Sequence, residues 1–231
     1  MDYTSVSILM PIYNGIEFID ESVTSVIQQT YTSWELIIGI NGHPFNSIVY
    51  QKAKEYEMKD KRIRVIEFPM ETIIGKSNTL NAMIPFCHYD WISLLDVDDI
   101  WNNKKLEYQM PFTKEYDVIG TRAIYFGDTS LHGHIPNIPT GDISVIPSFL
   151  DGNPIINSSV LLKKELCHWD ANTVLEDYDL WLKLRYITKC RFYNCFSVLV
   201  KHRLHDDSAF NSKGNSSGLH ALKEMYKIYN K

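Results

Sequence analysis

The sequence has 231 residues, 45% of them apolar, which is enough for one sizeable hydrophobic core. Its formal net charge is −5, because 28 Asp and Glu residues outnumber 23 Lys and Arg residues, and this argues against a nucleic-acid-binding protein. Four cysteines without a CxxC pair argue against a structural zinc site or a disulfide framework.

The amino terminus and the hydropathy of the chain indicate a soluble protein. The first residues contain no basic region, and their short apolar run is broken by Pro11, so they do not resemble a signal peptide. No segment reaches the roughly 18 apolar residues of a transmembrane helix. We therefore expect a cytoplasmic protein with reduced thiols, either free in solution or peripheral at a membrane.

Strands and helices alternate in the first half of the expected fold. Apolar runs predict four buried strands, at residues 6–10, 35–40, 62–68 and 89–97. The connecting helices are expected at residues 19–27, in the polar stretch that ends at residue 59, and at residues 75–83. This alternation predicts right-handed βαβ units, and hence an α/β fold with a mostly parallel central sheet flanked by helices.

The second half of the chain is less regular. Strands are expected at residues 117–126, 155–162 and 196–203 and a helix at residues 175–187, whereas residues 127–151 lack a clear period. Residues 206–218 are rich in Ser, Asn and Gly and predict a mobile loop. A final amphipathic helix is expected to pack on the body of the protein through Leu222, Met225, Tyr226 and Tyr229.

Three carboxylates follow the apolar run of the fourth expected strand. Alternate residues of a strand face the same side, so Asp96 and Asp98 should converge while Val97 turns into the core. Ligands of open α/β sheets bind at the carboxyl ends of strands, where this cluster lies. Hard oxygen ligands suit Mg²⁺ or Mn²⁺ holding a diphosphate. The alternative is a solvated acidic turn in which Asp99 caps the next helix.

Several segments, in a fixed order, resemble the inverting glycosyltransferase family 2, which has the GT-A fold. They cover roughly residues 5–208 and read VSILMPIYNG, ELIIGING, GKSNTLNA, DWISLLDVDDIWNNKKLEYQ, EDYDLWLKL and RLHDDS. The resemblance implies one GT-A domain over residues 1–231. It would consist of a nucleotide-binding half at 1–100, an acceptor half at 101–205, and a mobile loop and helix at 206–231.

The resemblance also implies a reaction and its partners. Such an enzyme moves a sugar from a nucleotide-sugar donor to a hydroxyl group of a glycan, protein or lipid-linked acceptor, with Mn²⁺ or Mg²⁺ as cofactor. Asp98 would ligate the cation directly, and Asp96 would touch the ribose or lie near the metal. Lys76, which by itself reads equally well as a solvated lysine, would approach the nucleotide or its phosphates.

The nucleotide pocket of the family is lined by the loop after the first strand. That loop maps here onto Pro11, Ile12, Tyr13 and Asn14, whose composition also fits a simple turn. The second strand of the family usually ends in two acidic residues, the first of which reads the base.

In this sequence those two acidic positions hold Ile40 and Asn41. An amide still pairs with a base edge, but the carboxylate acceptor for a uracil imide is gone, so thymidine and guanine donors stay open.

The helix expected at residues 175–187 carries the candidate catalytic base. Asp177 shares the apolar face of that helix with Leu180, Trp181 and Leu184, and should therefore look inward. By the resemblance, Asp177 is the general base that deprotonates the acceptor hydroxyl. Glu176 is the alternative base or a ligand of acceptor hydroxyls. Read without the resemblance, Asp177 is a carboxylate at a helix start, which is a common stabilising role.

Arg203 and His205 lie two residues apart near the end of the last expected strand, a spacing that predicts a shared face. A late histidine often completes the metal shell of GT-A enzymes, which suggests His205 as a metal ligand and Arg203 as a diphosphate contact. A surface histidine is the competing interpretation.

Two further functions stay open. One is a sugar-1-phosphate nucleotidyltransferase, although the loop PIYNG lacks the basic residues of that class. The other is a catalytically silent domain that binds nucleotide-sugars or glycans.

Overall fold

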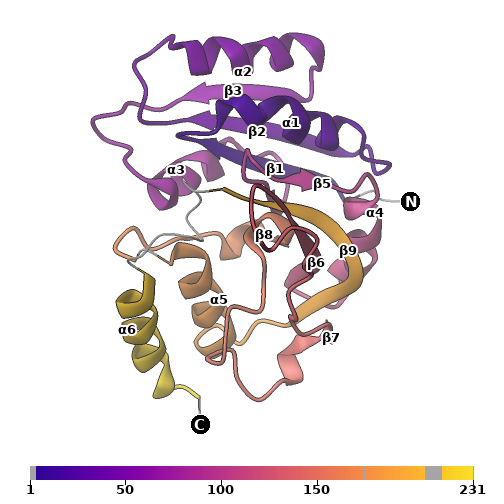
Figure 1. Cartoon of the computed structure of the whole chain (residues 1–231), viewed down its shortest axis with the longest axis vertical. Helices are drawn as coiled ribbons and strands as arrows, with labels where there is room; N and C mark the ends of the chain where they lie inside the picture. The colour runs from indigo at the N-terminus through magenta and orange to yellow at the C-terminus, as the bar shows by residue number, and fades with distance from the viewer. Residues whose placement is uncertain (1–3, 174, 206–214, 231) are drawn as a thin grey trace.

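The structure is a computed structural model, and it describes residues 4–173, 175–205 and 215–230. A sheet of nine strands runs through the molecule in the order β3-β2-β1-β4-β8-β6-β9-β5, with β7 beside β9 (Figure 1). The strands are β1 (Val6–Ile12), β2 (Trp34–Ile40), β3 (Ile63–Glu67), β4 (Trp91–Leu94), β5 (Ile100–Trp101), β6 (Val118–Gly127), β7 (Gly141–Asp142), β8 (Leu161–Lys163) and β9 (Phe192–Leu204). The helices are α1 (Ile19–Ile27), α2 (Ile48–Lys59), α3 (Lys76–Met83), α4 (Lys105–Gln109), α5 (Glu176–Tyr186) and α6 (Asn215–Lys227).

The first half is the parallel sheet that the alternating pattern predicts. Strands β3, β2, β1 and β4 all pair in parallel, and each of the seven residues of β2 is buried. Both faces of β1, β2 and β4 are covered, which explains why their sequences are mostly apolar, whereas β3 at the edge of the sheet is only partly buried. Alternate residues of β1 enter two different cores: Met10 packs with α1, whereas Leu9 packs with α3 and α5.

The second half of the sheet is mixed rather than parallel. β8 runs antiparallel to both β4 and β6, and β9 is parallel to β6 but antiparallel to β5 and β7. The strand expected at residues 155–162 is reduced to β8, because a 3₁₀ turn, η5 (Asn157–Ser159), precedes it. The last strand begins at Phe192, earlier than expected.

The fourth strand ends sooner than the apolar run suggests. β4 stops at Leu94, and residues 97 and 98 form a turn that leads to β5. Strand alternation is therefore not what places Asp96 and Asp98, although both line one cavity. Val97 is nevertheless buried, as expected.

The final helix packs on α5 with only part of its expected apolar face, because Met225 and Tyr229 are exposed. Leu222 and Tyr226 are buried, and the Tyr226 hydroxyl donates a hydrogen bond to Asp179 Oδ1 at 2.9 Å. α6 begins at Asn215, inside the segment expected to be a loop. The rest of that expected loop, residues 206–214, lies outside the described residues.

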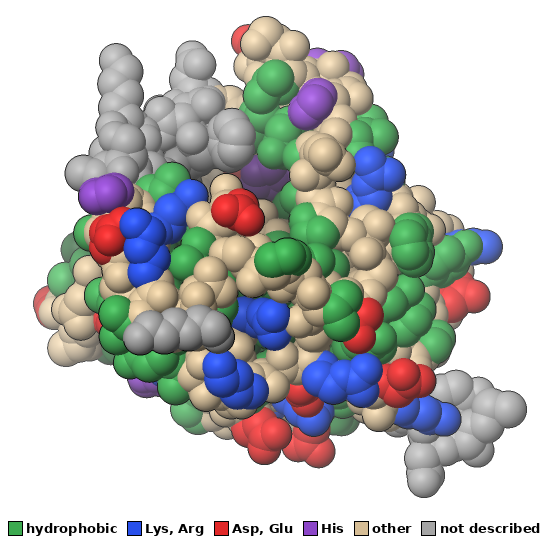
Figure 2. Space-filling model, turned by 90° about the horizontal axis from the view of Figure 1, so that it is seen from below, with side chains coloured by type: hydrophobic (Ala, Val, Ile, Leu, Met, Phe, Trp, Pro, Cys, Tyr) green, Lys and Arg blue, Asp and Glu red, His purple; other side chains and the backbone are tan. Residues whose placement is uncertain are grey.

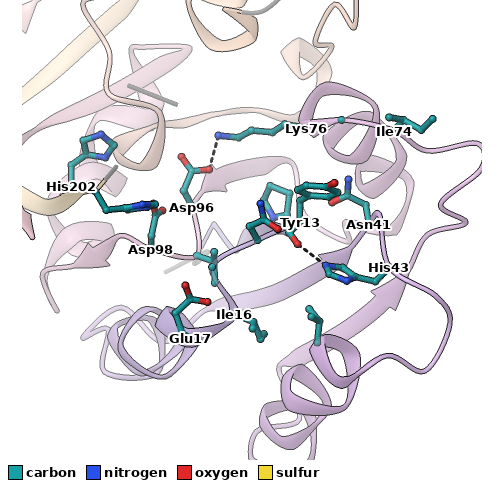
Figure 3. A pocket seen from close by; sticks show the side chains of 17 residues that line it. Tyr13, Ile16, Glu17, Asn41, His43, Ile74, Lys76, Asp96, Asp98 and His202 are labelled. Carbon is teal, nitrogen blue, oxygen red and sulfur yellow. Dashed lines mark hydrogen bonds and ion pairs between the residues drawn. The ribbon is translucent and has the colours of Figure 1, made fainter. Parts of the chain in front are cut away.

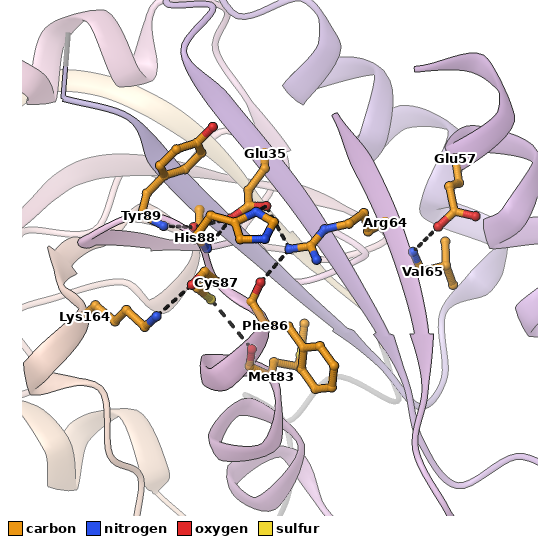
Figure 4. Close-up of polar contacts among 11 residues, drawn as sticks. Glu35, Glu57, Arg64, Val65, Met83, Phe86, Cys87, His88, Tyr89 and Lys164 are labelled. Carbon is orange, nitrogen blue, oxygen red and sulfur yellow. Dashed lines mark hydrogen bonds and ion pairs between the residues drawn. The ribbon is translucent and has the colours of Figure 1, made fainter. Parts of the chain in front are cut away.

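A buried carboxylate ties the parallel strands together at their amino ends (Figure 4). Glu35 of β2 accepts hydrogen bonds from Ser7 Oγ of β1 at 2.6 Å and from the guanidinium of Arg64 of β3 at 2.8 Å. The backbone N–H of His88 adds a third at 2.7 Å. Burial raises the pKa of Glu35, but these donors outweigh it and hold the pKa below its usual value.

The surface seen from below in Figure 2 carries Lys and Arg side chains next to Asp and Glu side chains along its lower edge. Among the helices of the described residues, none combines the length and the apolar character needed to cross a bilayer.

Candidate active site

A cavity of about 800 Å³ opens at the carboxyl ends of β1, β2 and β4 (Figure 3). This is where open α/β sheets bind ligands. Most of the residues singled out from the sequence line it together: Pro11, Tyr13, Asn14, Asn41, Lys76, Asp96, Asp98 and His205. Ile12 does not, because its side chain is fully buried in the core. Arg203, Glu176 and Asp177 are also not among the lining residues.

One end of the cavity is built from the segments that follow β1 and β2. The ring of Tyr13 lies over Gly42, where a Cβ would come within 2.2 Å of it and where φ is +73°. Glycine is therefore required at this position. The Nε2–H of His43 donates to the carbonyl oxygen of Tyr13 at 2.5 Å and holds the loop in place. The exposed Tyr13 ring is a flat surface on which a base could stack.

Asn41 lies at the same end of the cavity. It is only 2% exposed and lines the cavity wall, where its carboxamide can meet a polar ligand edge. Because an amide both donates and accepts, it suits a base that presents a donor beside an acceptor.

Asp96 is held on both oxygens. Lys76 Nζ lies 2.6 Å from Oδ1, and Asn157 Nδ2 donates to Oδ2 at 3.1 Å. The backbone N–H of Asp96 donates to Ser158 Oγ at 3.0 Å, so the turn η5 fixes both the main chain and the side chain. Burial raises the pKa of Asp96, but Lys76 and Asn157 outweigh it and lower the pKa. Asp96 is therefore ionised and pre-oriented.

The pKa of Asp98 is shifted in the opposite direction from that of Asp96. Burial, followed by the charges of Asp99 and Asp96, raises its pKa to about 6. His205 Nε2 lies 3.2 Å from Asp98 Oδ2 and opposes this shift. A divalent cation would relieve the repulsion, and the carboxylate and the imidazole are both donors that Mn²⁺ accepts. No three His, Cys, Asp or Glu side chains in the described part of the chain form a complete metal site.

Asp99 does not cap α4, as one interpretation of the sequence had it. Its carboxylate is fully buried and accepts hydrogen bonds from His202 Nδ1 at 2.9 Å and from the Arg203 backbone N–H at 2.8 Å. Sequence reasoning missed His202, which lines the cavity. The pairing of Ile100 with Lys201 brings Asp99 and His202 together, and no local pattern reveals that register.

Arg203 is occupied by structural contacts. Its guanidinium packs against the rings of Phe18 and Phe126, with its centre 4.4 and 4.3 Å from the ring centroids. It also pairs with Glu21, and its Nε donates to the Asp98 carbonyl oxygen at 2.9 Å. In this conformation Arg203 stabilises the turn that carries Asp98.

The first turn of α5 brings Glu176 and Asp177 next to this group. Lys76 Nζ lies 3.7 Å from Glu176 Oε1, so a single lysine joins Asp96 to the start of α5. Asn153 Nδ2 donates to Asp177 Oδ2 at 3.0 Å. Burial and then Glu176 raise the pKa of Asp177 to about 6, while Lys76 opposes them. A carboxylate with such a pKa is ionised at neutral pH and still able to accept a proton.

Comparison with known proteins finds similarity to glycosyltransferases. A model of the family described as "Glycosyl transferase family 2" matches residues 7–174. The Escherichia coli protein WfgD is described as a UDP-Glc:alpha-D-GlcNAc-diphosphoundecaprenol beta-1,3-glucosyltransferase. It is 28% identical over 221 residues, covering 92% of this chain and 82% of WfgD. The O-antigen biosynthesis glycosyltransferase WbnJ, also from E. coli, is 26% identical over 217 residues, covering 90% of this chain and 82% of WbnJ.

Solved structures confirm the GT-A fold. TarS of S. aureus in complex with UDP-GlcNAc superposes with a TM-score of 0.75 at 14% identity, covering 96% of this chain and 66% of that one. The mannosyltransferase PcManGT of Pyrobaculum calidifontis, in complex with GDP-Man and Mn²⁺, gives a TM-score of 0.66 at 11% identity. That match covers 99% of this chain and 64% of PcManGT.

Proposed function

This chain belongs to glycosyltransferase family 2, and from that premise we propose that it transfers a sugar from a nucleotide-sugar to an acceptor hydroxyl, with inversion at the anomeric carbon. The observation that carries the proposal is that Lys76 contacts two sets of carboxylates, through Asp96 in one and Glu176 in the other. Asp96 and Asp98 line the cavity that would take the donor, while Glu176 and Asp177 stand at its edge, where an acceptor would arrive.

The cavity offers a separate contact for each part of the donor. Tyr13 and Asn41 provide a stacking surface and an amide for the base. Asp96, fixed by Asn157 and Lys76, is placed to accept a hydrogen bond from the ribose. The amide can pair with a uracil, thymine or guanine edge, so a uridine, thymidine or guanosine diphospho-sugar fits this contact.

The residues around Asp98 fit Mn²⁺ or Mg²⁺. Asp98 and His205 would hold the cation, with oxygens of the donor diphosphate completing its shell, and a few protein ligands plus phosphates are usual for such ions. When bound, the cation supplies Lewis-acid stabilisation of the charge on the departing diphosphate. Lys76 would add a positive charge on the other side of Asp96.

Asp177 acts as the general base. Its carboxylate takes the proton of the acceptor hydroxyl while the hydroxyl oxygen attacks the anomeric carbon and the bond to the diphosphate oxygen breaks. Asn153 orients this carboxylate, and Glu176 binds a further hydroxyl of the acceptor. The acceptor is a glycan, a protein or a lipid-linked sugar, and the description of WfgD favours the lipid-linked class.

The test is a panel of UDP-, dTDP- and GDP-sugars with Mn²⁺, scored by release of the nucleoside diphosphate. We expect one base to be preferred. Asp98→Ala and Asp177→Ala should each lose about a hundredfold or more in rate. Asp90→Ala is the matched control, because it removes an exposed carboxylate just before the amino end of β4.

Two results would contradict the proposal. Binding of donors by the unmutated protein without any turnover would favour a silent binding domain. Release of diphosphate from a nucleoside triphosphate and a sugar-1-phosphate would favour a nucleotidyltransferase.

A further inference from the structure

His202 and Asp99 form an ion pair on the wall of the cavity (Figure 3). His202 Nδ1 lies 2.9 and 3.1 Å from the two oxygens of Asp99, which is 0% exposed. The opposite edge of the ring, which carries Nε2, faces away from Asp99, and the His202 side chain is 24% exposed. No described residue makes a hydrogen bond with Nε2.

The ring of His202 is positively charged at neutral pH. Among the described residues, only the His202 ring and the Arg203 backbone N–H donate hydrogen bonds to the buried Asp99 carboxylate. Burial lowers the pKa of His202, but Asp99 and then Asp96 and Asp98 outweigh it and raise the pKa to about 9. A charged imidazole whose Nδ1–H points at Asp99 has a second donor, Nε2–H, to offer.

The other cationic side chains around the donor site are already engaged. Lys76 contacts Asp96 and Glu176, and Arg203 is packed between Phe18 and Phe126. His202 lies beside Asp96 and Asp98, far along the cavity from Asn41 and His43 (Figure 3). His202 therefore lies in the part of the cavity expected to hold the phosphates rather than the base.

We propose that His202 binds the donor diphosphate, donating a hydrogen bond from Nε2 to a phosphate oxygen, with Asp99 as the residue that positions the ring. This inference rests on the proposed function, because it assumes a nucleoside diphosphate in this cavity. It assigns to His202 the phosphate contact that the sequence suggested for Arg203.

The test measures binding to the full chain by calorimetry in the presence of EDTA, with UDP, UMP, dTDP, dTMP, GDP and GMP as ligands. We expect the unmutated protein to prefer the diphosphate over the monophosphate of its base. His202→Gln should reduce that preference by about tenfold to a hundredfold, because it removes a charge-assisted hydrogen bond. His202→Lys keeps the charge and should retain part of the preference.

His43→Gln is the matched control, since His43 lies at the other end of the same cavity. It should affect the monophosphate and the diphosphate equally. Equal effects of His202→Gln on both ligands, or none, would overturn the inference. So would weaker Mn²⁺ binding by His202→Gln, measured by electron paramagnetic resonance, because the ring would then be a metal ligand.

Failure of the proposed function looks different. If none of UDP, dTDP and GDP binds the unmutated protein, with or without Mn²⁺, then the cavity is not a donor site and the inference falls with it. Asp99→Asn gives a second readout: provided that its melting temperature shows a folded protein, it should lower the diphosphate preference as His202→Gln does.

Discussion

Lys76 is the residue on which the two groups of carboxylates converge. Its Nζ lies 2.6 Å from Asp96 and 3.7 Å from Glu176. Burial lowers the pKa of Lys76, but Asp96 and Glu176, with Asp177, outweigh it and raise the pKa, so the side chain stays charged. That charge in turn works against the forces that raise the pKa of Asp177. One lysine thus influences both the donor site and the proposed base.

Lys76→Met should change the pH dependence of transfer. Without the positive charge the pKa of Asp177 rises from about 6, so the acid limb of kcat/KM moves to higher pH. Each unit of that movement costs about tenfold in the ionised fraction below the new pKa. The profile is measured between pH 5 and 9 at saturating Mn²⁺, with Lys76→Arg as the charge-preserving control.

The position of the acid limb decides the result. A limb that stays in place while the KM for the donor rises would mean that Lys76 serves the phosphates and does not influence Asp177. A limb that moves equally in Lys76→Arg would show that the shape of the lysine, and not its charge, matters.

Glu35 plays a structural role at the scale of the sheet. It connects β1, β2 and β3 at the ends of the strands that lie away from the cavity (Figure 4). Its pKa is lowered in the folded protein, so its contribution to stability is complete above the unfolded value of about 4.5 and is lost as the pH falls through the folded value.

Glu35→Gln should lower the free energy of unfolding at pH 7 by about 1–3 kcal/mol, because it removes a charged acceptor from three donors. Arg64 is partly exposed, so the value should lie below that of a fully buried pair. Urea titrations at pH 7 and pH 3 measure the effect, which should shrink at the lower pH. Glu115→Gln, on an exposed side chain, is the control.

The parallel half of the sheet could be predicted from the sequence because the patterns that indicate its strands are local. Apolar runs such as residues 36–40 occur where both faces of a strand are covered, and β2 begins within one residue of the strand expected at residues 35–40. The brevity of β8 was not readable, because the turn η5 is kept by contacts with Asp96 and with Thr121 of β6.

The residues of the candidate site also differ in whether the sequence alone predicts them. Asp98 and Asp177 follow from motifs, whereas Asn157 and His202 depend on which strands meet. Only the pairing of β5 with β9 places His202 beside Asp99, and β5 lies where the sequence suggested the start of a helix. Strand pairing across a hundred residues leaves no periodic signal in a single sequence.

The cavity draws on elements from both halves of the molecule. Tyr13, Asn41 and Asp96 follow β1, β2 and β4, whereas His202 belongs to β9. A ligand that contacts all of them should therefore stabilise the folded chain as a whole.

Mn²⁺ together with the preferred nucleoside diphosphate, at about a hundred times its Kd, should add about 2.7 kcal/mol of stability. For a chain of this length that corresponds to a rise in Tm of about 5–10 °C. Differential scanning fluorimetry measures the shift. Asp98→Asn should abolish the part of the Tm shift that requires Mn²⁺. An undiminished Tm shift in that variant would rule out Asp98 as a metal ligand.

The contact between α5 and α6 has a consequence for shortened forms of the chain. The Tyr226 hydroxyl donates a hydrogen bond to Asp179, a buried acid in the helix that carries Asp177. Without α6, Asp179 would lose this donor and α5 would lose one of its supports.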